Sequence, residues 1–151
     1  MQVSSAFTAF MTKAEPRLLR ALVARYGVQR GRDAALDAMA YGWRHWERVN
    51  AMDNPVGYLY RVGSSSVRPT REPPMLAPVD DHREPWIEPG LERSLDTLSE
   101  SQRVAVVLRH SFDWTHREIA EVLGVSVRTV RSHLDRGMGK LRSELEVTVD
   151  G

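Results

Sequence analysis

The sequence predicts an all-α protein of two small helical domains, and three observations lead to that prediction. Apolar residues recur at three- and four-residue spacing in both halves of the chain. Strand signals are absent from the first 67 residues. Six of the eight prolines fall between residues 69 and 89, together with four acidic residues from Asp80 to Glu88. Because proline lacks a backbone donor and breaks helices, we expect a flexible, proline-rich acidic linker at 68–90.

The linker divides the 151 residues into parts that we interpret as separate domains. Residues 1–67 are expected to form a helical domain of three helices. Residues 91–146 are expected to form a helix-turn-helix domain of a winged-helix-like type with three or four helices, and residues 147–151 form a tail.

The first domain has few breaks in its helical pattern. Gly27 and Gly31 are expected to bracket the end of the first helix, and a second helix is predicted from about Arg32 to Val49. Asn54-Pro55 places proline in the first turn of a third helix, which Pro69 ends. One apolar stripe is predicted on the second helix: Leu36, Met39, Ala40, Trp43 and Trp46.

The second domain carries clear signals for the ends of its helices. Ser99 followed by Gln102, and Thr115 followed by Glu118, fit capping boxes, in which side chains satisfy the free amides of a first turn. Gly124 suits a left-handed helix end. A last helix is predicted to begin after a Ser126 cap and to run to about Leu145.

Residues 115–135 have the spacing of a helix-turn-helix. Ala120 is small where the two helices cross, and Gly124 tolerates positive φ in the turn. Val125 and Val130 are expected to pack the second helix across the first. At about 100° per residue, the second helix has an apolar face and an opposite polar face. The predicted DNA contacts are Ser126, Arg128, Thr129, Arg131, Ser132, Arg136 and Lys140.

The formal net charge of +1 conceals a partition along the chain. Residues 1–71 hold 11 basic and 5 acidic side chains, residues 72–90 hold one and five, and residues 91–151 hold 9 and 10. Within the last segment, residues 126–142 hold five basic side chains and one acidic. The predicted second helix of the motif is therefore basic, as a DNA-binding helix would be.

Several functional classes are disfavoured. Without cysteine there is no disulfide, thiolate metal site or cysteine nucleophile. No apolar run approaches about 18 residues, and no secretory signal is visible, so we expect a cytoplasmic protein without a membrane span. Gly137-Met-Gly-Lys140 lacks the full phosphate-loop pattern, and the histidines lack metal-ligand spacing. Asp80 and Asp81 could pair as catalytic carboxylates, but they lie in the predicted proline-rich linker, which cannot hold them rigidly. We expect no enzymatic activity, metal or cofactor.

The sequence resembles bacterial sigma factors of the extracytoplasmic-function type. Residues 91–145 resemble their region 4, and three segments of the first domain are similar to region 2: 17–20, 43–46 and 54–61. The resemblance implies binding of the −35 promoter element by region 4, and RNA polymerase core and an anti-sigma protein as partners. Residues 127–134 are also similar to response-regulator output domains, but those proteins lack a region 2.

Two departures from the family pattern leave alternatives open. At the polymerase-binding positions Asp33 and Asp37 are acidic as in the family, whereas Leu36 stands where glutamine is usual. Ser65 and Pro69 stand where an asparagine and an aspartate of the −10 apparatus are usual, so that apparatus is short or missing. The alternatives are a sigma-derived regulator that cannot melt promoters and a pure interaction module. Trp43, Trp46, Tyr58 and Tyr60 are expected to be mostly core.

Overall fold

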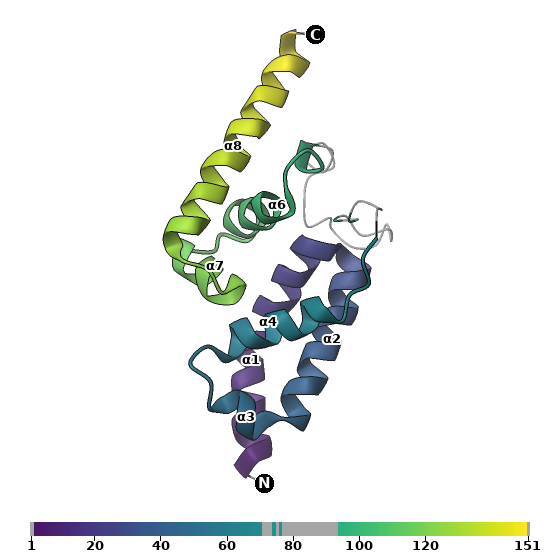
Figure 1. Ribbon diagram of the computed structural model, residues 1–151, viewed down its shortest axis with the longest axis vertical. Helices are drawn as coiled ribbons and strands as arrows, with labels where there is room; N and C mark the ends of the chain where they lie inside the picture. The colour runs from purple at the N-terminus through teal and green to yellow at the C-terminus, as the bar shows by residue number, and fades with distance from the viewer. Residues whose placement is uncertain (1, 71–73, 75, 77–93, 151) are drawn as a thin grey trace.

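The computed structural model describes residues 2–70, 74, 76 and 94–150, and within them every secondary-structure element is a helix. This confirms the predicted fold class. We call residues 2–70 the front unit and residues 94–150 the back unit (Figure 1). The front unit holds α1 (Gln2–Tyr26), α2 (Val28–Arg44), α3 (Trp46–Asn50) and α4 (Pro55–Ser65). The back unit holds α6 (Glu100–Val106), the π-helical turn η1 (Val107–Ser111), α7 (His116–Leu123) and α8 (Val127–Asp150).

Two glycines set the turn between α1 and α2, but in different ways. Gly27 lies between the two helices with φ of 94°, a left-handed conformation that only glycine adopts without strain. Gly31 lies inside α2, where an added Cβ would stand 2.5 Å from the backbone of Val23. The predicted break is therefore a single residue, and α2 begins four residues earlier than predicted. Gly31 allows α1 and α2 to pack closely.

The predicted packing face of α2 is wrong in part. The buried residues of this helix are small: Gly31, Ala34, Ala35, Ala38 and Gly42. Because they repeat at three- and four-residue spacing, they form a stripe that brings α2 against α1. The larger predicted stripe points mostly outward, with Leu36 61% and Trp43 53% exposed, and only Trp46 is buried, at 5%.

The predicted second helix is divided at His45, whose φ of −121° and ψ of 32° interrupt the helix between α2 and α3. Asn54 then begins α4, because its side chain accepts a hydrogen bond from the Gly57 amide at 3.0 Å. Proline follows at the first helical position, as predicted. Since α4 ends at Ser65, it stops four residues before Pro69.

The predicted caps of the back unit are confirmed. Ser99 and Gln102 form a capping box at the start of α6, and Thr115 and Glu118 form one at α7. Between these helices, η1 widens the helix by one residue per turn, and Asp113 then reverses the chain with φ of 59°. Aspartate is among the residues that tolerate this left-handed conformation.

The long helix α8 runs along one side of the molecule, and its last turns project beyond the other helices (Figure 1). It continues to Asp150, past the predicted end. Val130, Leu134 and Leu141 are buried and Val127 and Met138 pack against the core, so the predicted apolar face is confirmed. At Gly137 an added Cβ would lie 2.8 Å from Val106 Cγ2, which marks where α8 crosses α6.

The two units pack against each other. Helix α1 contacts α6, η1 and α7, and α4 contacts α7. Buried side chains from both units belong to one apolar cluster, which also includes Leu76, at 1% exposure. Most of the predicted linker, with Asp80 and Asp81, lies outside the described residues.

Candidate nucleic-acid interface

The turn between α7 and α8 is built as the sequence predicts. Gly124 ends α7 in the left-handed conformation, with φ of 68° and ψ of 35°. The Val125 amide donates to the Ala120 carbonyl at 3.1 Å, and the Ser126 hydroxyl accepts from the Thr129 amide at 3.0 Å. Local hydrogen bonds thus fix the angle at which α8 leaves the turn. Val125 departs from the prediction, because it is 38% exposed.

The predicted DNA-contact residues divide into exposed and partly buried positions. The charged ones are all exposed: Arg128, Arg131, Arg136 and Lys140. Thr129 and Ser132 are half-buried, and the Thr129 hydroxyl lies 2.9 Å from that of Ser126. The first turns of α8 therefore present guanidinium groups to solvent beside short hydroxyl side chains. This composition suits the base edges and phosphates of a major groove.

Arg136 and Lys140 lie farther along α8, beside the start of α6. They line an open hollow of about 570 Å³ together with Thr97, Gln102 and Glu144. Arg136 is eight residues beyond Arg128, which at about 1.5 Å per residue corresponds to roughly 12 Å along the helix axis. The basic face of α8 therefore extends over more than two helical turns, starting from the N-terminal part that usually reaches base edges.

A second candidate surface lies on α2, in the front unit. Asp33, Leu36 and Asp37, which were predicted to bind polymerase, are all exposed on this helix. Leu36 and Trp43 are seven residues apart, so they lie on one side of α2. We call Asp33, Leu36, Asp37 and Trp43 the α2 face. The sequence prediction missed Trp43 here, although its seven-residue distance from Leu36 was a visible signal.

The other aromatic residues considered for base stacking are less available. Trp46 and Tyr60 are buried, at 5% and 4% exposure, which confirms the prediction that they are core. Tyr58 is half-buried, and its hydroxyl lies 3.1 Å from that of Tyr41. Arg48 donates to Tyr41, so these tyrosine hydroxyls are held together by a cation on α3.

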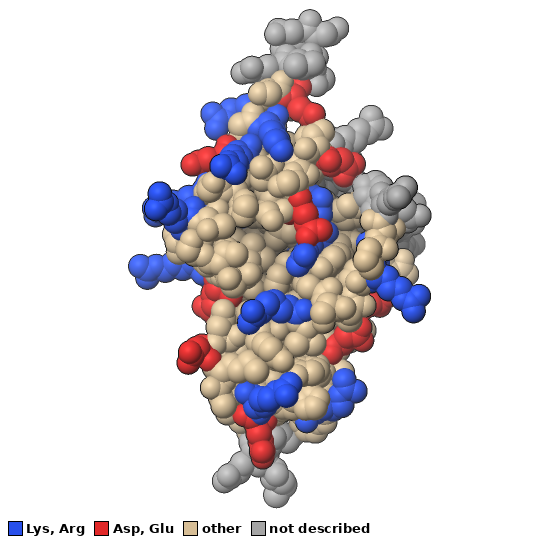
Figure 2. Space-filling view, in the orientation of Figure 1, with Lys and Arg blue, Asp and Glu red and all other residues tan. Residues whose placement is uncertain are grey.

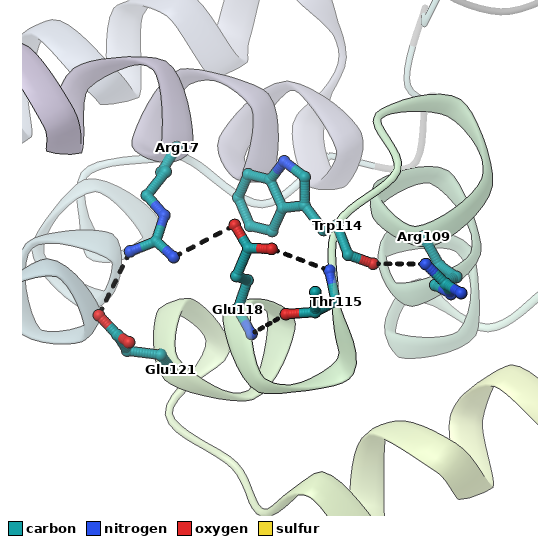
Figure 3. A network of polar contacts seen from close by, with 6 residues as sticks. All are labelled: Arg17, Arg109, Trp114, Thr115, Glu118 and Glu121. Atoms are coloured by element: carbon teal, nitrogen blue, oxygen red, sulfur yellow. Dashed lines mark hydrogen bonds and ion pairs between the residues drawn. The ribbon is translucent and has the colours of Figure 1, made fainter.

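An ion-pair network joins the two units beside the helix-turn-helix (Figure 3). Arg17 on α1 lies between two carboxylates of α7, with Nη2 at 3.4 Å from Glu118 and Nη1 at 3.3 Å from Glu121. Hydrogen bonds from Thr115, with a smaller effect of the nearby Arg17 charge, lower the pKa of Glu118. Glu118 therefore both caps α7 and attaches it to the front unit.

Two polar residues missed by the sequence analysis lie at the same contact. Arg103 on α6 is 7% exposed, and burial lowers the pKa of its guanidinium. Asn54, at the start of α4, donates from Nδ2 to the Glu121 carbonyl at 2.7 Å. Neither residue carries a sequence signal for such a role, because each partner is more than 60 positions away.

The charges on the molecular surface are mixed. Figure 2 shows basic and acidic side chains interspersed over the face that it draws.

Within the described residues, no group of three or more histidine, cysteine, aspartate or glutamate side chains is placed to hold a metal ion. No helix in the same part of the chain combines the length and apolar character of a membrane span.

Comparisons with known proteins identify the family. Residues 90–141 match the family described as sigma-70, region 4. The chain is 32% identical over 125 residues to the RNA polymerase sigma-E factor of Streptomyces coelicolor, covering 75% of this chain and 70% of that protein. The sigma-E factor of Streptomyces antibioticus is likewise 32% identical over 125 residues, which cover 76% and 69% of the two chains.

A solved structure is similar in fold. The sigma factor RpoE of Bartonella quintana, solved with the anti-sigma factor NepR, superposes with a TM-score of 0.62 at 16% identity, covering 94% of this chain and 98% of that one. The identity and coverage of the Streptomyces relatives, together with the region 4 match, show the family. The chain belongs to the RNA polymerase sigma factors, as a transcription initiation factor of the extracytoplasmic-function type.

Proposed function

We propose that α8 binds the −35 promoter element in the major groove while the α2 face binds core RNA polymerase. The observation that carries the DNA-binding part is the exposed basic face of α8, which directly follows a turn fixed by Gly124 and Ser126. We assign base contacts to Arg128, Thr129, Ser132 and Arg136. Arg131 and Lys140 bind phosphates, and Ser126 mainly positions the helix.

Exposure and composition support the role of the α2 face. Leu36 and Trp43 are exposed apolar side chains on a helix whose small residues already provide the packing against α1. Asp33 and Asp37 flank them with negative charge. An exposed apolar pair with a charged rim is typical of a protein-binding surface. The substitution of leucine for the usual glutamine fits this apolar character.

The part of the chain that would contact the −10 promoter element is proposed to be short. Because α4 ends at Ser65, the position of Pro69 lies beyond the helix that would carry −10 residues. We further propose two functional domains, at 1–67 and 91–146, joined by a linker at 68–90. The protein acts in the cytoplasm and catalyses no reaction itself. The solved complex of the Bartonella relative supports an anti-sigma protein as a further partner.

The DNA-binding assignment is tested with the full chain and a duplex selected from random sequence for binding to it. Arg128→Ala is expected to weaken binding to the selected duplex about 5- to 150-fold, as the loss of one bidentate base contact predicts. Lys13→Ala on α1 removes the same charge from an exposed site and serves as the control. Equal affinities of wild type, Arg128→Ala and Arg136→Ala would contradict the assignment.

Polymerase binding is tested separately with purified core enzyme. Leu36→Glu is expected to weaken binding to core at least tenfold, whereas Gln29→Glu, at another exposed position of α2, adds the same charge and leaves binding unchanged. Run-off transcription on a promoter that carries the selected −35 element then measures promoter opening. A specific transcript supports the initiation function, while DNA binding without a transcript contradicts promoter opening by this chain.

A further inference from the structure

Four aromatic side chains meet where the start of α1 lies beside the end of α2 and the start of α3 (Figure 1): Phe7, Phe10, Trp43 and Trp46. The Phe7 ring meets both indoles edge-on, with its centroid 5.2 Å from that of Trp43 at 65° and 5.5 Å from that of Trp46 at 76°. Phe10 packs against Trp46, at 5.2 Å and 41°. Edge-to-face pairs at such distances are favourable. Phe7 therefore joins the two tryptophans.

The two tryptophans that Phe7 joins have different environments. Trp46 is 5% exposed and belongs to the core, whereas Trp43 is 53% exposed. Phe7 itself is half-buried, and Gly42 leaves room for its ring, because an added Cβ would lie 3.4 Å from Phe7 Cε2. The ring is thus fixed by Trp46 on the core side and supports Trp43 on the surface side. Trp43 is therefore an exposed indole whose orientation is restrained by α1.

Trp43 ends an exposed apolar stripe on α2. Leu36, Ala40 and Trp43 follow one another at spacings of four and three residues, which places them on one side of the helix. Leu36 is 61% exposed, and Ala40 is exposed as well. The opposite side of α2 packs against α1 through small residues. Since this packing does not bury the stripe, its exposure indicates a protein-binding surface.

Two carboxylates beside the stripe are not neutralised within the described residues. Asp33 and Asp37 are exposed and four residues apart, a spacing at which like charges destabilise a helix. Neither takes part in the four ion pairs found in the same part of the chain. A partner with basic side chains would compensate them. A second copy of this chain would not, because a symmetric contact between two α2 faces brings each carboxylate near its own counterparts.

We propose that Trp43 is the anchor residue of the polymerase contact and that Phe7 of α1 positions it. The proposal rests on the proposed binding of core RNA polymerase by the α2 face. Tryptophan is among the residues that most often dominate the binding energy of an interface. An anchor that is restrained before binding loses less conformational entropy on binding. Trp46, Phe7 and Trp43 thus connect the core of the front unit to its partner, which presents an apolar pocket with basic side chains around it.

Leucine substitutions separate positioning from stability. Phe7→Leu keeps an apolar side chain but removes the ring that meets Trp43. Phe10→Leu makes the same change one turn later, where the ring packs against Trp46, and is the matched control. Phe7→Tyr retains the ring and tests rescue by the conservative variant. Urea denaturation of each variant reports any general loss of stability.

The affinity of the full chain for purified core polymerase is the main measurement. Trp43→Ala is expected to weaken binding about 30-fold or more, as the loss of an interface anchor predicts. Phe7→Leu is expected to weaken it about 2- to 10-fold, the range of one aromatic pair, whereas Phe10→Leu and Phe7→Tyr stay within about twofold of wild type. In the Trp43→Ala background, Phe7→Leu should have no further effect, because a positioning residue acts only through its anchor.

The orientation of Trp43 is measured in the free protein by fluorine NMR after labelling with fluorotryptophan. Trp43→Phe identifies the Trp43 resonance. Phe7→Leu is expected to shift and narrow this resonance, because the indole loses its neighbour and gains mobility, and Phe10→Leu is expected to leave it in place. An unchanged Trp43 resonance in Phe7→Leu would overturn the positioning role.

The remaining outcomes separate this proposal from the proposed function. Core binding that Leu36→Glu weakens and Trp43→Ala does not would overturn the anchor role while keeping the α2 face as the binding surface. If neither variant weakens binding, the proposed function of the α2 face fails as well. Equal weakening by Phe7→Leu and Phe10→Leu would contradict positioning. A dimer of the free chain that Trp43→Ala separates, measured by sedimentation equilibrium, would assign the surface to a second copy and overturn the proposal.

Discussion

The guanidinium of Arg103 donates through Nη2 to the carbonyl oxygen of Arg25 at 2.8 Å, so a side chain of α6 completes the C-terminal end of α1. Both residues are basic, yet they are compatible because only the backbone of Arg25 is used here. The Arg25 side chain turns instead to Glu100 and to Ser64, whose Oγ lies 3.1 Å from Nη1. Alternating donors and acceptors thus connect α6, α1 and α4.

Replacing Arg103 should destabilise the whole chain. Arg103→Ala leaves the carbonyls of Ala24 and Arg25 without this donor in a buried place, so we expect the free energy of unfolding to fall by about 1–3 kcal/mol. Urea denaturation followed by circular dichroism measures it. Arg117→Ala, at an exposed site of α7, is the control. A change equal to that of the control would show that Arg103 contributes nothing to stability.

Gly31 and Gly139 should respond oppositely to the same substitution. Gly31→Ala places Cβ 2.5 Å from the Val23 backbone, and overpacking of this kind costs about 1–3 kcal/mol. At Gly139 nothing lies within 4 Å of an added Cβ, so Gly139→Ala should stabilise α8 by up to about 1 kcal/mol through helix propensity. Thermal denaturation of both variants tests this pair, and shifts of the same sign would contradict it.

Replacing Gly124 should lower the free energy of unfolding. Its φ of 68° is unfavourable for residues with a side chain, so Gly124→Ala is expected to lose about 1–2 kcal/mol even though the space around it is open. Gly124→Asn should lose less, because asparagine tolerates this conformation. Chemical denaturation of the two variants gives the comparison, and equal losses would indicate that φ is not the cause.

The stabilising effect of Glu118 should depend on pH. The folded protein lowers the pKa of this carboxyl, so its contribution is complete above the ordinary glutamate pKa and is lost as pH falls through the lowered folded value. The free energy of unfolding of wild type should therefore exceed that of Glu118→Gln at pH 7, with the difference shrinking towards pH 3. A difference that is constant over this range would contradict the prediction.

Salt dependence should separate the two kinds of DNA contact on α8. Arg131→Ala is expected to reduce the slope of log affinity against log salt by about 0.9, because one phosphate contact is lost, while weakening all sequences equally. Arg128→Ala should instead reduce discrimination between the selected duplex and a scrambled one. Fluorescence anisotropy from 0.05 to 0.2 M salt distinguishes these outcomes, and identical effects of both variants would count against the division.

Local signals explain why the helix-turn-helix could be predicted. The two capping boxes and Gly124 act over three or four residues, so their outcome is fixed by nearby sequence. On α2, by contrast, the larger apolar residues suggested the wrong packing face, since close approach to α1 selects Ala34, Ala38 and other small residues. The contacts of Arg17 and Arg103 depend on how the two units meet, which no local pattern encodes.

Asn54 has one further consequence, because the two ends of its side chain report on different parts of the molecule. Its oxygen begins α4, whereas its nitrogen holds the carbonyl of Glu121 in the back unit. Separation of the units would release the nitrogen and leave the oxygen bonded. The Nδ2 protons are therefore a built-in spectroscopic reporter: their NMR resonances and exchange with solvent follow the contact between Asn54 and α7 in the wild-type protein.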